Sequence, residues 1–509
     1  MHVAIVHGYF LGDSGSGVYT RQLAEALTRL GHDVTLVCQE RDPERYAFID
    51  SVWALDPANT TLTQLAERPP ADRVGPGSCR LVRPDDGGRL LVYVDGPFAG
   101  FERDGVRAFQ DAPAEWIDAF VARNVAALRT TVERWPSDVV LAQHTIAQPQ
   151  IVREALAGRC PYTVTVHGSE LNFSLRSDAR LAPLGISGLS GASAVVALTQ
   201  SSLADVVGWA AQYGLAIAEK GAVLPPGIDF SVFAPAPSRG AAVDALVREV
   251  GLPADFEFAP DDDVLAFAAR VGWNKGIHHL VVAVSLLAAE RPGVCLLVAG
   301  DGPARASLER LAALLSAGEA EAAREFAASD PELRTTEEFG PLIPDGAGPF
   351  GEARIAFLGH LPAAGVARIF ATADVAVAPS IFPEAAGLVT SEALAAGALP
   401  LAAYHSGLAA IADIVADEFG DPMFTQLRAG AGLTAGIVDA VRWLLDRYPT
   451  ADPAFRARLH ALAEKRFPTW DEIARRYLAL AMGAGHGAPH ARRADRPDAS
   501  GPGACAPRR

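Results

Sequence analysis

The fold is indicated first by residues 2–17, which read HVAIVHGYFLGDSGSG. The run from His2 to His7 is short, apolar and β-branched, which is typical of a buried strand. A glycine-rich turn follows and leads directly into a predicted helix over residues 18–30. Glycines expose backbone N–H groups at a helix N-terminus, where an anion such as phosphate can bind. Such turns are also made for close packing alone, and both roles stay open at this point.

The same alternation of strands and helices continues through the first half of the chain. Apolar runs predict strands at residues 2–7, 33–38, 89–94, 138–143, 162–167, 194–198 and 221–224, and the clearest helices at 18–30 and 115–134. This alternation is typical of a parallel sheet with helices on both faces. The region from Gln39 to Gly88 is rich in Pro, Arg and Asp, and is expected to form long loops with little regular structure.

A second alternating series follows the linker Pro225-Pro226-Gly227. Strands are predicted near residues 263–269, 294–299, 354–358 and 374–378, with helices at 277–290, 304–328, 363–371 and 388–396. The stretch 329–352, thick in Gly and Pro, is expected to be an inserted loop. We therefore predict domains at residues 1–226 and 227–466, a further amphipathic helix at 467–484 and a disordered tail at 485–509.

The pattern as a whole predicts an α/β protein with two doubly wound domains of the Rossmann type. At 509 residues the chain is too long for one hydrophobic core and suits two. Ligands of such sheets bind beyond the carboxyl ends of the strands, and a domain boundary is a favoured place for a cleft. We therefore expect the ligand to lie in a cleft between the two domains.

Charge and composition exclude several classes of protein. The formal net charge is −16 and both halves of the chain are acidic, which argues against nucleic acid and anionic lipid as partners. The five cysteines are scattered and include no CxxC pair. We therefore expect neither a disulfide framework nor a zinc site, and a reducing compartment is the simpler setting.

The sequence also predicts a cytoplasmic location. The N-terminus lacks the basic, apolar and small-residue order of a secretory signal peptide. The longest uncharged stretch, Ala393–Ala412, is interrupted by Gly397, Pro400 and Gly407, so it is not expected to span a membrane. We therefore expect no integral membrane association, and the oligomeric state stays open.

Two cations follow the first predicted strand of the second domain, in the run Arg270-Val-Gly-Trp-Asn-Lys275-Gly. The chain contains only three lysines (Lys220, Lys275 and Lys465), so each raises the question of a chemical role. Arg270 and Lys275 can converge on one diphosphate, whose charge must be neutralised when it leaves without a metal. An ordinary solvated loop is the alternative on these residues alone.

The most informative stretch is residues 379–397, PSIFPEAAGLVTSEALAAG. Glu384 lies in a loop before a helix that begins near Gly387, so we expect its carboxylate in the cleft. Gly387 and Leu388 offer N–H groups to a phosphate at the helix N-terminus. Glu392 follows within the same helix. We interpret the small residues after it as close packing of the helix on the sheet.

In their order, these segments resemble glycosyltransferase family 4, whose fold is GT-B. The shared motifs are the glycine-rich loop, Arg-x4-Lys-Gly, Ala-Gly-Asp-Gly-Pro, Phe-Leu-Gly and Glu-x7-Glu. The linker before Asp229 resembles the family's crossover between domains, and residues 470–482 resemble its final helix, which returns to the first domain. The resemblance spans residues 1–482. It implies retaining, metal-independent transfer of a sugar from a nucleoside-diphosphate donor to an unknown acceptor. UDP is preferred over GDP as the nucleotide of the donor.

The resemblance also implies roles for individual residues. Arg270 and Lys275 would bind the donor diphosphate. Glu384 would hold the donor sugar, and Glu392 the ribose hydroxyls. The other implied positions are Gly15 and Gly17 at the phosphate, Gly387 and Leu388 near the donor, His167 beside the donor sugar and His144 facing the acceptor. The first domain would bind the acceptor and the second the nucleotide sugar, with no cofactor or metal.

Some features depart from the family pattern or suggest other activities. Ala386 stands where the family usually has a bulky residue, and the insertion at 329–352 has no known counterpart. A sugar-nucleotide epimerase and a non-catalytic sugar-nucleotide binder stay open. An NAD-dependent oxidoreductase is suggested by Glu40 after the second strand and opposed by Thr20, which replaces the third Gly of GxGxxG. Asp261-Asp262-Asp263 precedes its strand and is expected to be solvated surface, not a metal motif.

Overall fold

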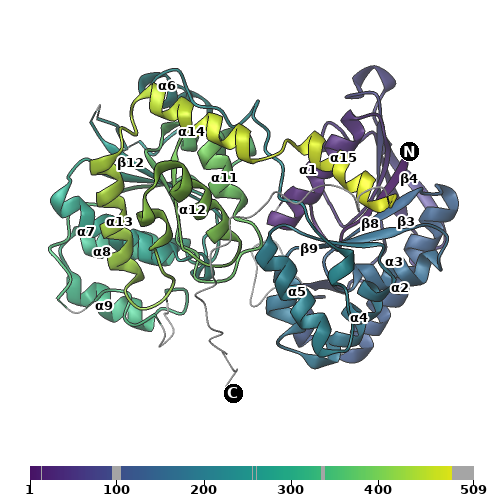
Figure 1. Ribbon diagram of the computed structural model, residues 1–509. Coiled ribbons are helices and arrows are strands. Elements are labelled where there is room, and N and C mark those ends of the chain that lie inside the picture. The colour runs from purple at the N-terminus through teal and green to yellow at the C-terminus, as the bar shows by residue number, and fades with distance from the viewer. Residues whose placement is uncertain are drawn as a thin grey trace.

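The computed structural model describes residues 1–12, 14–93, 105–254, 256–259, 261–333, 339–344 and 346–483. The chain forms two α/β lobes, each built on its own mainly parallel sheet (Figure 1). The two doubly wound domains predicted from the sequence are therefore confirmed. The tail predicted at 485–509 lies outside the described residues.

The first sheet has the strand order β11-β10-β9-β8-β1-β2-β5-β3-β4. Its strands are β1 (His2–Val6), β2 (Asp33–Val37), β3 (Ser51–Leu55), β4 (Leu62–Glu67), β5 (Ser78–Arg83), β8 (Val139–Gln143), β9 (Tyr162–Val166), β10 (Ala194–Ala197) and β11 (Gly221–Val223). Neighbouring strands run parallel, and β3 and β4 form an antiparallel hairpin at one edge. The carboxyl ends of β1, β8 and β9 therefore meet at the same edge of the sheet.

Helices cover both faces of this sheet. They are α1 (Gly15–Arg29), α2 (Ala114–Arg134), α3 (Gln148–Leu156), α4 (Ala182–Gly191), α5 (Gln200–Gln212) and α15 (Trp470–Ala481). Successive residues of β1 point to opposite faces, as the two-residue repeat of a strand requires. Val3 and Ile5 join the core that contains α1 and α15, whereas Ala4 and Val6 join the core that contains α2 to α5.

The region 39–88 contains regular structure, and the expectation of long loops there is wrong. β3, β4 and β5 lie within it and extend the sheet beyond β2. β4 is exposed along most of its length, so its polar sequence lacks the apolar alternation by which a strand is recognised. The strand expected at 89–94 forms at Leu90–Val92 (β6), but it pairs with β7 (Val106–Ala108) in a separate small sheet and does not join the nine-stranded one.

The second sheet has the order β14-β13-β12-β15-β16. Its strands are β12 (Asp263–Ala268), β13 (Val294–Ala299), β14 (Arg354–Phe357), β15 (Val375–Ala378) and β16 (Leu399–Ala402). Its helices are α6 (Arg239–Glu249), α7 (Ile277–Glu290), α8 (Arg305–Ser316), α9 (Ala320–Ser329), α10 (Ala363–Thr372), α11 (Leu388–Ala395), α12 (Ser406–Phe419), α13 (Leu433–Arg447) and α14 (Pro453–Arg466). The strand order reverses between β12 and β15, and doubly wound sheets bind their ligands at this switch point.

One expectation for the second domain needs correction, and the role of a second segment becomes clear. The helix expected over 304–328 is divided into α8 and α9 near Gly318, whose φ of 74° interrupts a right-handed helix. The stretch 329–352 has no helix or strand in its described part beyond the end of α9, as expected of a loop. It is nevertheless part of the domain core, because Phe339, Leu342 and Ile343 are buried against the other apolar residues of that domain.

Asp262 is buried, so the expectation of a solvated surface at 261–263 is wrong for its central residue. Only 3% of Asp262 is exposed, and its carboxylate accepts two hydrogen bonds of 2.8 Å from the Arg354 guanidinium. Burial would raise the pKa of this carboxyl, but the bonds from Arg354 hold it below its usual 3.8. Asp262 therefore ties β14 to the start of β12.

The final helix, α15, packs on the first domain beside α1 (Figure 1, yellow). Its Tyr477 hydroxyl lies 3.0 Å from the Tyr19 hydroxyl of α1 and 3.0 Å from the Thr165 hydroxyl of β9. The Trp470 ring meets Tyr19 edge-on at 5.1 Å. A side chain at Gly227 would lie 2.5 Å from the Trp470 nitrogen, so the two segments that join the domains are in contact.

The stretch Ala393–Ala412 includes the end of α11, all of β16 and the first half of α12. It is therefore divided among three elements of the second domain. Among the described residues, no helix has both the length and the apolar character needed to cross a bilayer.

The seam between α15 and the first domain can be tested with Tyr477→Phe. We expect this change to lower the free energy of unfolding by about 1–3 kcal/mol, because the buried hydroxyls of Tyr19 and Thr165 each lose a partner. Urea unfolding followed by circular dichroism measures the loss. Arg476→Ala, an exposed neighbour on the same helix, should change stability by less than about 0.5 kcal/mol. Equal losses in the two variants would contradict the role of the hydroxyl.

Candidate active site

The glycine-rich turn after β1 leads into the first turn of α1, where Ser14 is the N-cap. The Gly17 N–H donates a hydrogen bond of 3.0 Å to the Ser14 side-chain oxygen. A side chain at Gly17 would lie 2.5 Å from the Phe10 carbonyl oxygen, whereas one at Gly15 would meet nothing within 4 Å. Gly17 therefore serves close packing and its N–H is engaged, while Gly15 borders open space.

Glu40 is held by backbone groups and is not available to a ribose. Its carboxylate accepts hydrogen bonds from the N–H groups of Leu11 (2.8 Å), Arg41 (3.0 Å) and Asp42 (3.0 Å). The residue is 5% exposed. The feature that suggested an NAD-dependent oxidoreductase therefore has a structural role.

The loops that follow β12 and β15 are joined by backbone contacts at the switch point of the second sheet. The Asn274 carbonyl oxygen accepts hydrogen bonds from the N–H groups of Ile381 (3.1 Å) and Phe382 (3.2 Å). Gly276 has a φ of 68°, and a side chain there would lie 2.0 Å from the Pro379 carbonyl oxygen. Glycine is therefore required at this position both by conformation and by space.

This junction brings Lys275 and Glu384 together, 109 residues apart in the chain. The Lys275 ammonium donates a hydrogen bond of 2.8 Å to the Glu384 carboxylate, and both side chains are mostly buried. Burial alone would raise the pKa of Glu384, but the charge of Lys275 holds it below its usual 4.5. Arg270 lies in the same loop as Lys275, partly buried, two residues beyond the end of β12.

The N-terminus of α11 faces the same region. Gly387 is its N-cap with a φ of 63°, and Leu388 is its first residue. Glu392 lies one turn further, where burial raises the pKa of its carboxyl to about 8 and the charge of Arg21 acts in the opposite direction. Arg21 belongs to α1 of the other domain, so the charges of the two domains interact here. Sequence analysis missed Arg21, because a single arginine inside an amphipathic helix carries no motif.

The loop that carries Glu384 also makes the contact between the two domains. The Ala385 carbonyl oxygen accepts hydrogen bonds of 3.0 Å from the hydroxyls of both Thr199 and Ser202 at the start of α5. The rings of Phe382 and Phe173 stack at 4.2 Å with an interplanar angle of 2°. Ala386 and its neighbour pack partly buried against the core of the first domain. The small residue at 386 therefore lies within a close contact between domains.

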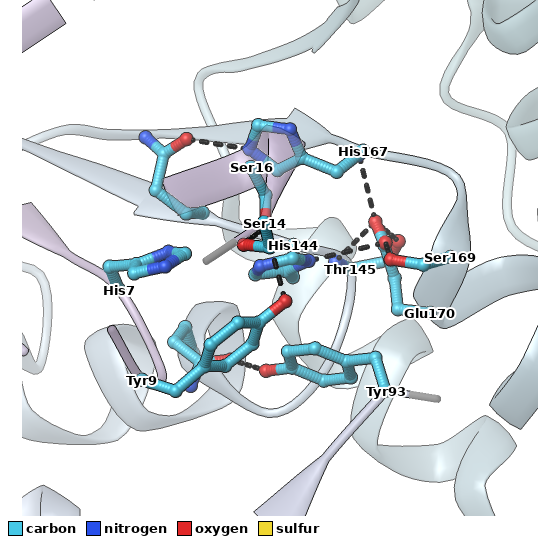
Figure 2. A network of polar contacts seen from close by, with 12 residues as sticks. His7, Tyr9, Ser14, Ser16, Tyr93, His144, Thr145, His167, Ser169 and Glu170 are labelled. Carbon is cyan, nitrogen blue, oxygen red and sulfur yellow. Dashed lines mark hydrogen bonds and ion pairs between the residues drawn. The ribbon is translucent and has the colours of Figure 1, made fainter. Parts of the chain in front are cut away.

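In the first domain, His167 and His144 belong to one buried polar network at the ends of β8 and β9 (Figure 2). His167 Nε2 lies 2.9 Å from Gln143 Oε1, and His144 Nδ1 lies 3.2 Å from Glu170 Oε2. Glu170 also accepts hydrogen bonds from the N–H groups of His167 (3.0 Å) and Thr145 (3.1 Å). The two histidines predicted from the sequence are therefore neighbours, with ring centroids 4.8 Å apart.

The protonation of this network follows from its burial. Burial and the neighbouring His144 lower the pKa of His167 to about 3. Burial likewise holds the pKa of His7 well below 6.5. Burial would raise the pKa of Glu170, but the hydrogen bond from His144 and the nearby imidazoles lower it to about 2. At neutral pH, His7 and His167 are therefore neutral and Glu170 is ionised.

Several members of this network were not predicted as site residues. They are His7, Tyr9, Tyr93, Gln143, Thr145 and Glu170, and all are buried. The available signal was Glu170, an acid three residues after His167 beside an apolar segment. A buried carboxylate there needs several donors, which could have indicated a polar network.

Comparison with known proteins finds a family model that matches part of this chain. Residues 14–227 match the family described as Glycosyl transferase 4-like domain. A 2-deoxystreptamine glucosyltransferase of Streptomyces kanamyceticus is 28% identical over 84% of this chain and 93% of its own. A D-inositol 3-phosphate glycosyltransferase of Segniliparus rotundus is 26% identical over 66% of this chain and 65% of its own.

Solved structures share the two-domain fold at low identity. A sucrose-phosphate synthase from Thermosynechococcus elongatus has a TM-score of 0.59 and 19% identity, over 95% of this chain and 98% of its own. Anabaena HepE in complex with UDP has a TM-score of 0.57 and 16% identity, over 95% of this chain and 100% of its own. The GT-B fold predicted from the sequence is therefore confirmed.

The junction between the two loops can be tested with Gly276→Ala. We expect a loss of about 2 kcal/mol or more in the free energy of unfolding, because the new methyl group combines an unfavourable φ with a backbone clash. Chemical denaturation of the second domain measures it. Gly318→Ala is the matched control, since Gly318 has a φ of 74° but nothing within 4 Å of the added carbon. It should lose only the conformational part, about 1 kcal/mol. Equal losses would mean that the contact with Pro379 contributes nothing.

Proposed function

Since this chain is a glycosyltransferase of the family 4-like group, we propose that it transfers a sugar from a nucleoside diphosphate with retention of configuration and without a metal. The observation that carries the proposal is the Lys275–Glu384 pair, with Arg270 in the same loop and the N-terminus of α11 alongside. These groups supply two positive charges and a carboxylate at the switch point of the second sheet. The two positive charges can bind a diphosphate, and the carboxylate can accept hydrogen bonds from the sugar attached to it.

In the proposed reaction, the bond between the anomeric carbon of the donor and the diphosphate oxygen breaks, and that oxygen keeps the electron pair. The acceptor hydroxyl attacks the anomeric carbon from the same face, and its proton passes to the leaving diphosphate. Lys275 and Arg270 stabilise the negative charge that develops on the diphosphate. The N–H groups of Gly387 and Leu388 add the positive end of the α11 dipole.

Donor binding would exchange the partners of the ion pair. Lys275 and Glu384 are bonded to each other at 2.8 Å. When the donor enters, Lys275 would turn to the diphosphate and Glu384 to the sugar hydroxyls. Neutral His167 would offer a hydrogen bond near the same sugar, because the next residue, Gly168, lies close to the Glu384 loop. A side-chain carbon at Gly168 would be 3.5 Å from Ala385 Cβ.

Glu392 is proposed to bind the two ribose hydroxyls of the nucleotide. It lies on α11, one turn from Gly387, so a nucleotide whose diphosphate meets the helix N-terminus places its ribose alongside. We propose UDP in preference to GDP. The choice of uridine as the nucleoside is supported by the structural similarity to HepE, which has been solved with UDP and with UDP-glucose.

We also propose a cytoplasmic setting with small molecules as the partners. The described cysteines Cys38, Cys79, Cys160 and Cys295 are free thiols, which suits a reducing compartment. The net charge of −16 does not favour nucleic acid.

The proposed role of Lys275 predicts the effect of removing it. Wild-type enzyme should keep its activity in EDTA. Lys275→Ala should lower kcat/KM at least about a hundredfold, because the negative charge on the leaving diphosphate loses about 3 kcal/mol of stabilisation in the transition state. Release of nucleoside diphosphate from a panel of nucleotide sugars measures the rate.

The other two lysines are matched controls for this test. Lys220 donates a hydrogen bond to the Ser190 carbonyl, and Lys465 lies in the last turn of α14. Their alanine variants should stay within about threefold of the wild type. Equal effects at all three positions would contradict the proposed site, and loss of wild-type activity in EDTA with rescue by manganese would contradict the metal-free mechanism.

The raised pKa of Glu392 predicts a pH dependence of nucleotide binding. The pKa of about 8 in the free protein should fall when two ribose hydroxyls donate to the ionised carboxylate. Affinity for the nucleoside diphosphate should therefore rise about tenfold or more between pH 6 and pH 8 and level off above that, since one unit of pKa corresponds to a factor of ten. Calorimetry at pH 6, 7 and 8 measures it.

Two variants separate this effect from the titration of the nucleotide itself. Glu392→Gln should bind more weakly at pH 8 and retain only the pH dependence of the ligand. Glu384→Gln should keep the wild-type dependence, because Glu384 is proposed to touch the sugar and not the nucleotide. The assignment is inverted if Glu384→Gln abolishes the pH dependence and Glu392→Gln preserves it.

A further inference from the structure

The backbone of Glu384 is held by the first two residues of α12. Its N–H donates a hydrogen bond of 2.9 Å to the Ser406 hydroxyl oxygen, and its carbonyl oxygen accepts one of 2.8 Å from the Gly407 N–H. Both backbone polar groups of Glu384 are therefore bonded to consecutive residues of another element. One of the two bonds depends on a side chain, so a substitution can remove it without touching Glu384 itself.

The backbone conformation of Ser406 is unusual. Its φ is 48°, in the left-handed region that few non-glycine residues adopt, and serine is not among those that favour it. Glycine would adopt this φ without the steric cost of a side chain. Left-handed residues that are kept in spite of this cost gather at functional sites, where their surroundings determine the conformation. What serine adds over glycine at this position is the hydroxyl that accepts the hydrogen bond from Glu384.

The Ser406 hydroxyl is itself held in place by His405, the N-cap of α12. His405 Nδ1 lies 3.0 Å from Ser406 Oγ, and His405 Nε2 lies 2.6 Å from the Ser380 carbonyl oxygen. A carbonyl oxygen only accepts, so Nε2 carries a hydrogen and donates it, whether or not the imidazole is charged. The ring therefore joins Ser406 to Ser380, whose hydroxyl donates to the Asn274 carbonyl oxygen. The segment 380–384 is thus fastened at both ends.

The start of α12 also packs closely on the loop that carries Glu384. A side chain at Gly407 would collide with the Ala385 carbonyl group. The same carbonyl oxygen accepts the hydrogen bonds from Thr199 and Ser202 of α5, and α12 contacts α5. The loop is therefore held by α12 of its own domain and by α5 of the other domain, with Glu384 next to the residue that both contact.

These backbone bonds matter most once the donor is bound. In the free protein the Glu384 carboxylate is bonded to Lys275. In the proposed reaction Lys275 turns to the diphosphate, so the carboxylate loses the cation that held its side chain. Its position relative to the sugar then depends on the backbone of Glu384, and a displacement of about 1 Å at a reacting group can cost about a hundredfold in rate.

We propose that Ser406 is a positioning residue for sugar transfer, whose hydroxyl fixes the backbone of Glu384 so that the carboxylate stays directed at the donor sugar after Lys275 has left it. This rests on the proposed function. His405 supports the arrangement by holding the Ser406 hydroxyl. In this role Ser406 acts through Glu384 and contacts neither the sugar nor the nucleotide.

Two variants that both lack the hydroxyl separate positioning from stability. Ser406→Ala keeps a side chain at the left-handed position, whereas Ser406→Gly relieves it, so the glycine variant should unfold at a higher urea concentration than the alanine variant. Both should lower kcat for release of nucleoside diphosphate about tenfold, because the sugar-binding carboxylate is misplaced. The affinity for free nucleoside diphosphate should stay within about twofold of the wild type, because Glu384 is proposed to contact the sugar. Wild-type kcat in either variant overturns the proposal, since a merely structural role predicts a loss only in the less stable one.

Ala157→Gly is the matched control for the change of backbone conformation. Ala157 also has a φ of 48°, is exposed and lies at the C-cap of α3 in the first domain. Glycine there should raise the urea midpoint and leave kcat within about twofold of the wild type. A loss of kcat as large as that of Ser406→Gly would mean that the hydroxyl is not the cause, and overturns the proposal.

Amide hydrogen exchange tests the contact without any turnover. In Ser406→Ala, peptides that contain Glu384 should exchange about fivefold faster than in the wild type, because the Glu384 N–H has lost its acceptor, while peptides from β13 should not change. Unchanged exchange at Glu384 overturns the role of the hydroxyl. A wild type that turns over no nucleotide sugar refutes the proposed function instead, and the exchange result then decides alone whether Ser406 holds Glu384.

Discussion

The carbonyl oxygen of Asn274 is the contact on which the ligand-binding edge of the second domain depends. It accepts hydrogen bonds from the Ser380 hydroxyl (3.2 Å) and from the next two backbone N–H groups. The strand order places the loops after β12 and β15 at the same edge of the sheet. These hydrogen bonds then join the two loops to each other. The separation of Lys275 and Glu384 is therefore set by backbone. An ion pair between two flexible side chains without such support is worth little, because ordering them costs conformational entropy.

The same loop then fixes how the two domains meet. In the six residues 382–387 of this loop, the Phe382 ring stacks on Phe173 and the Ala385 carbonyl oxygen accepts a hydrogen bond from the start of α5. Gly387 is the N-cap of α11. Glu384 lies between Phe382 and Ala385 in the sequence, and its carboxylate is bonded to Lys275. Any change in the relative position of the domains is therefore felt by the residues proposed to hold the donor, which links the closing of the domains to the assembly of the site.

The sequence was most informative where a residue's neighbours along the chain decide its place. Gly387 could be predicted because it lies directly before a recognisable helix, and Lys275 and Glu384 because they sit in loops that follow predicted strands. Arg21 and Glu170 could not, because their importance arises from partners on other elements, and β4 could not, because its exposed edge needs no apolar pattern. Gly17 was predicted at the site for its N–H, but its contribution is the space it leaves for the Phe10 carbonyl oxygen.

The contact at Ala385 has a consequence for the stability of α5. It includes two neutral hydroxyl-to-carbonyl hydrogen bonds, the stacked rings of Phe173 and Phe382, and the packing of Ala385 and Ala386 against the first domain. Water can replace each hydrogen bond at a net cost of about 0.5–1.5 kcal/mol. Thr199 also accepts a hydrogen bond from the Ser202 N–H, so α5 remains capped when the domains part. The hydrogen bonds of this contact can therefore be exchanged for bonds to water without the unfolding of α5.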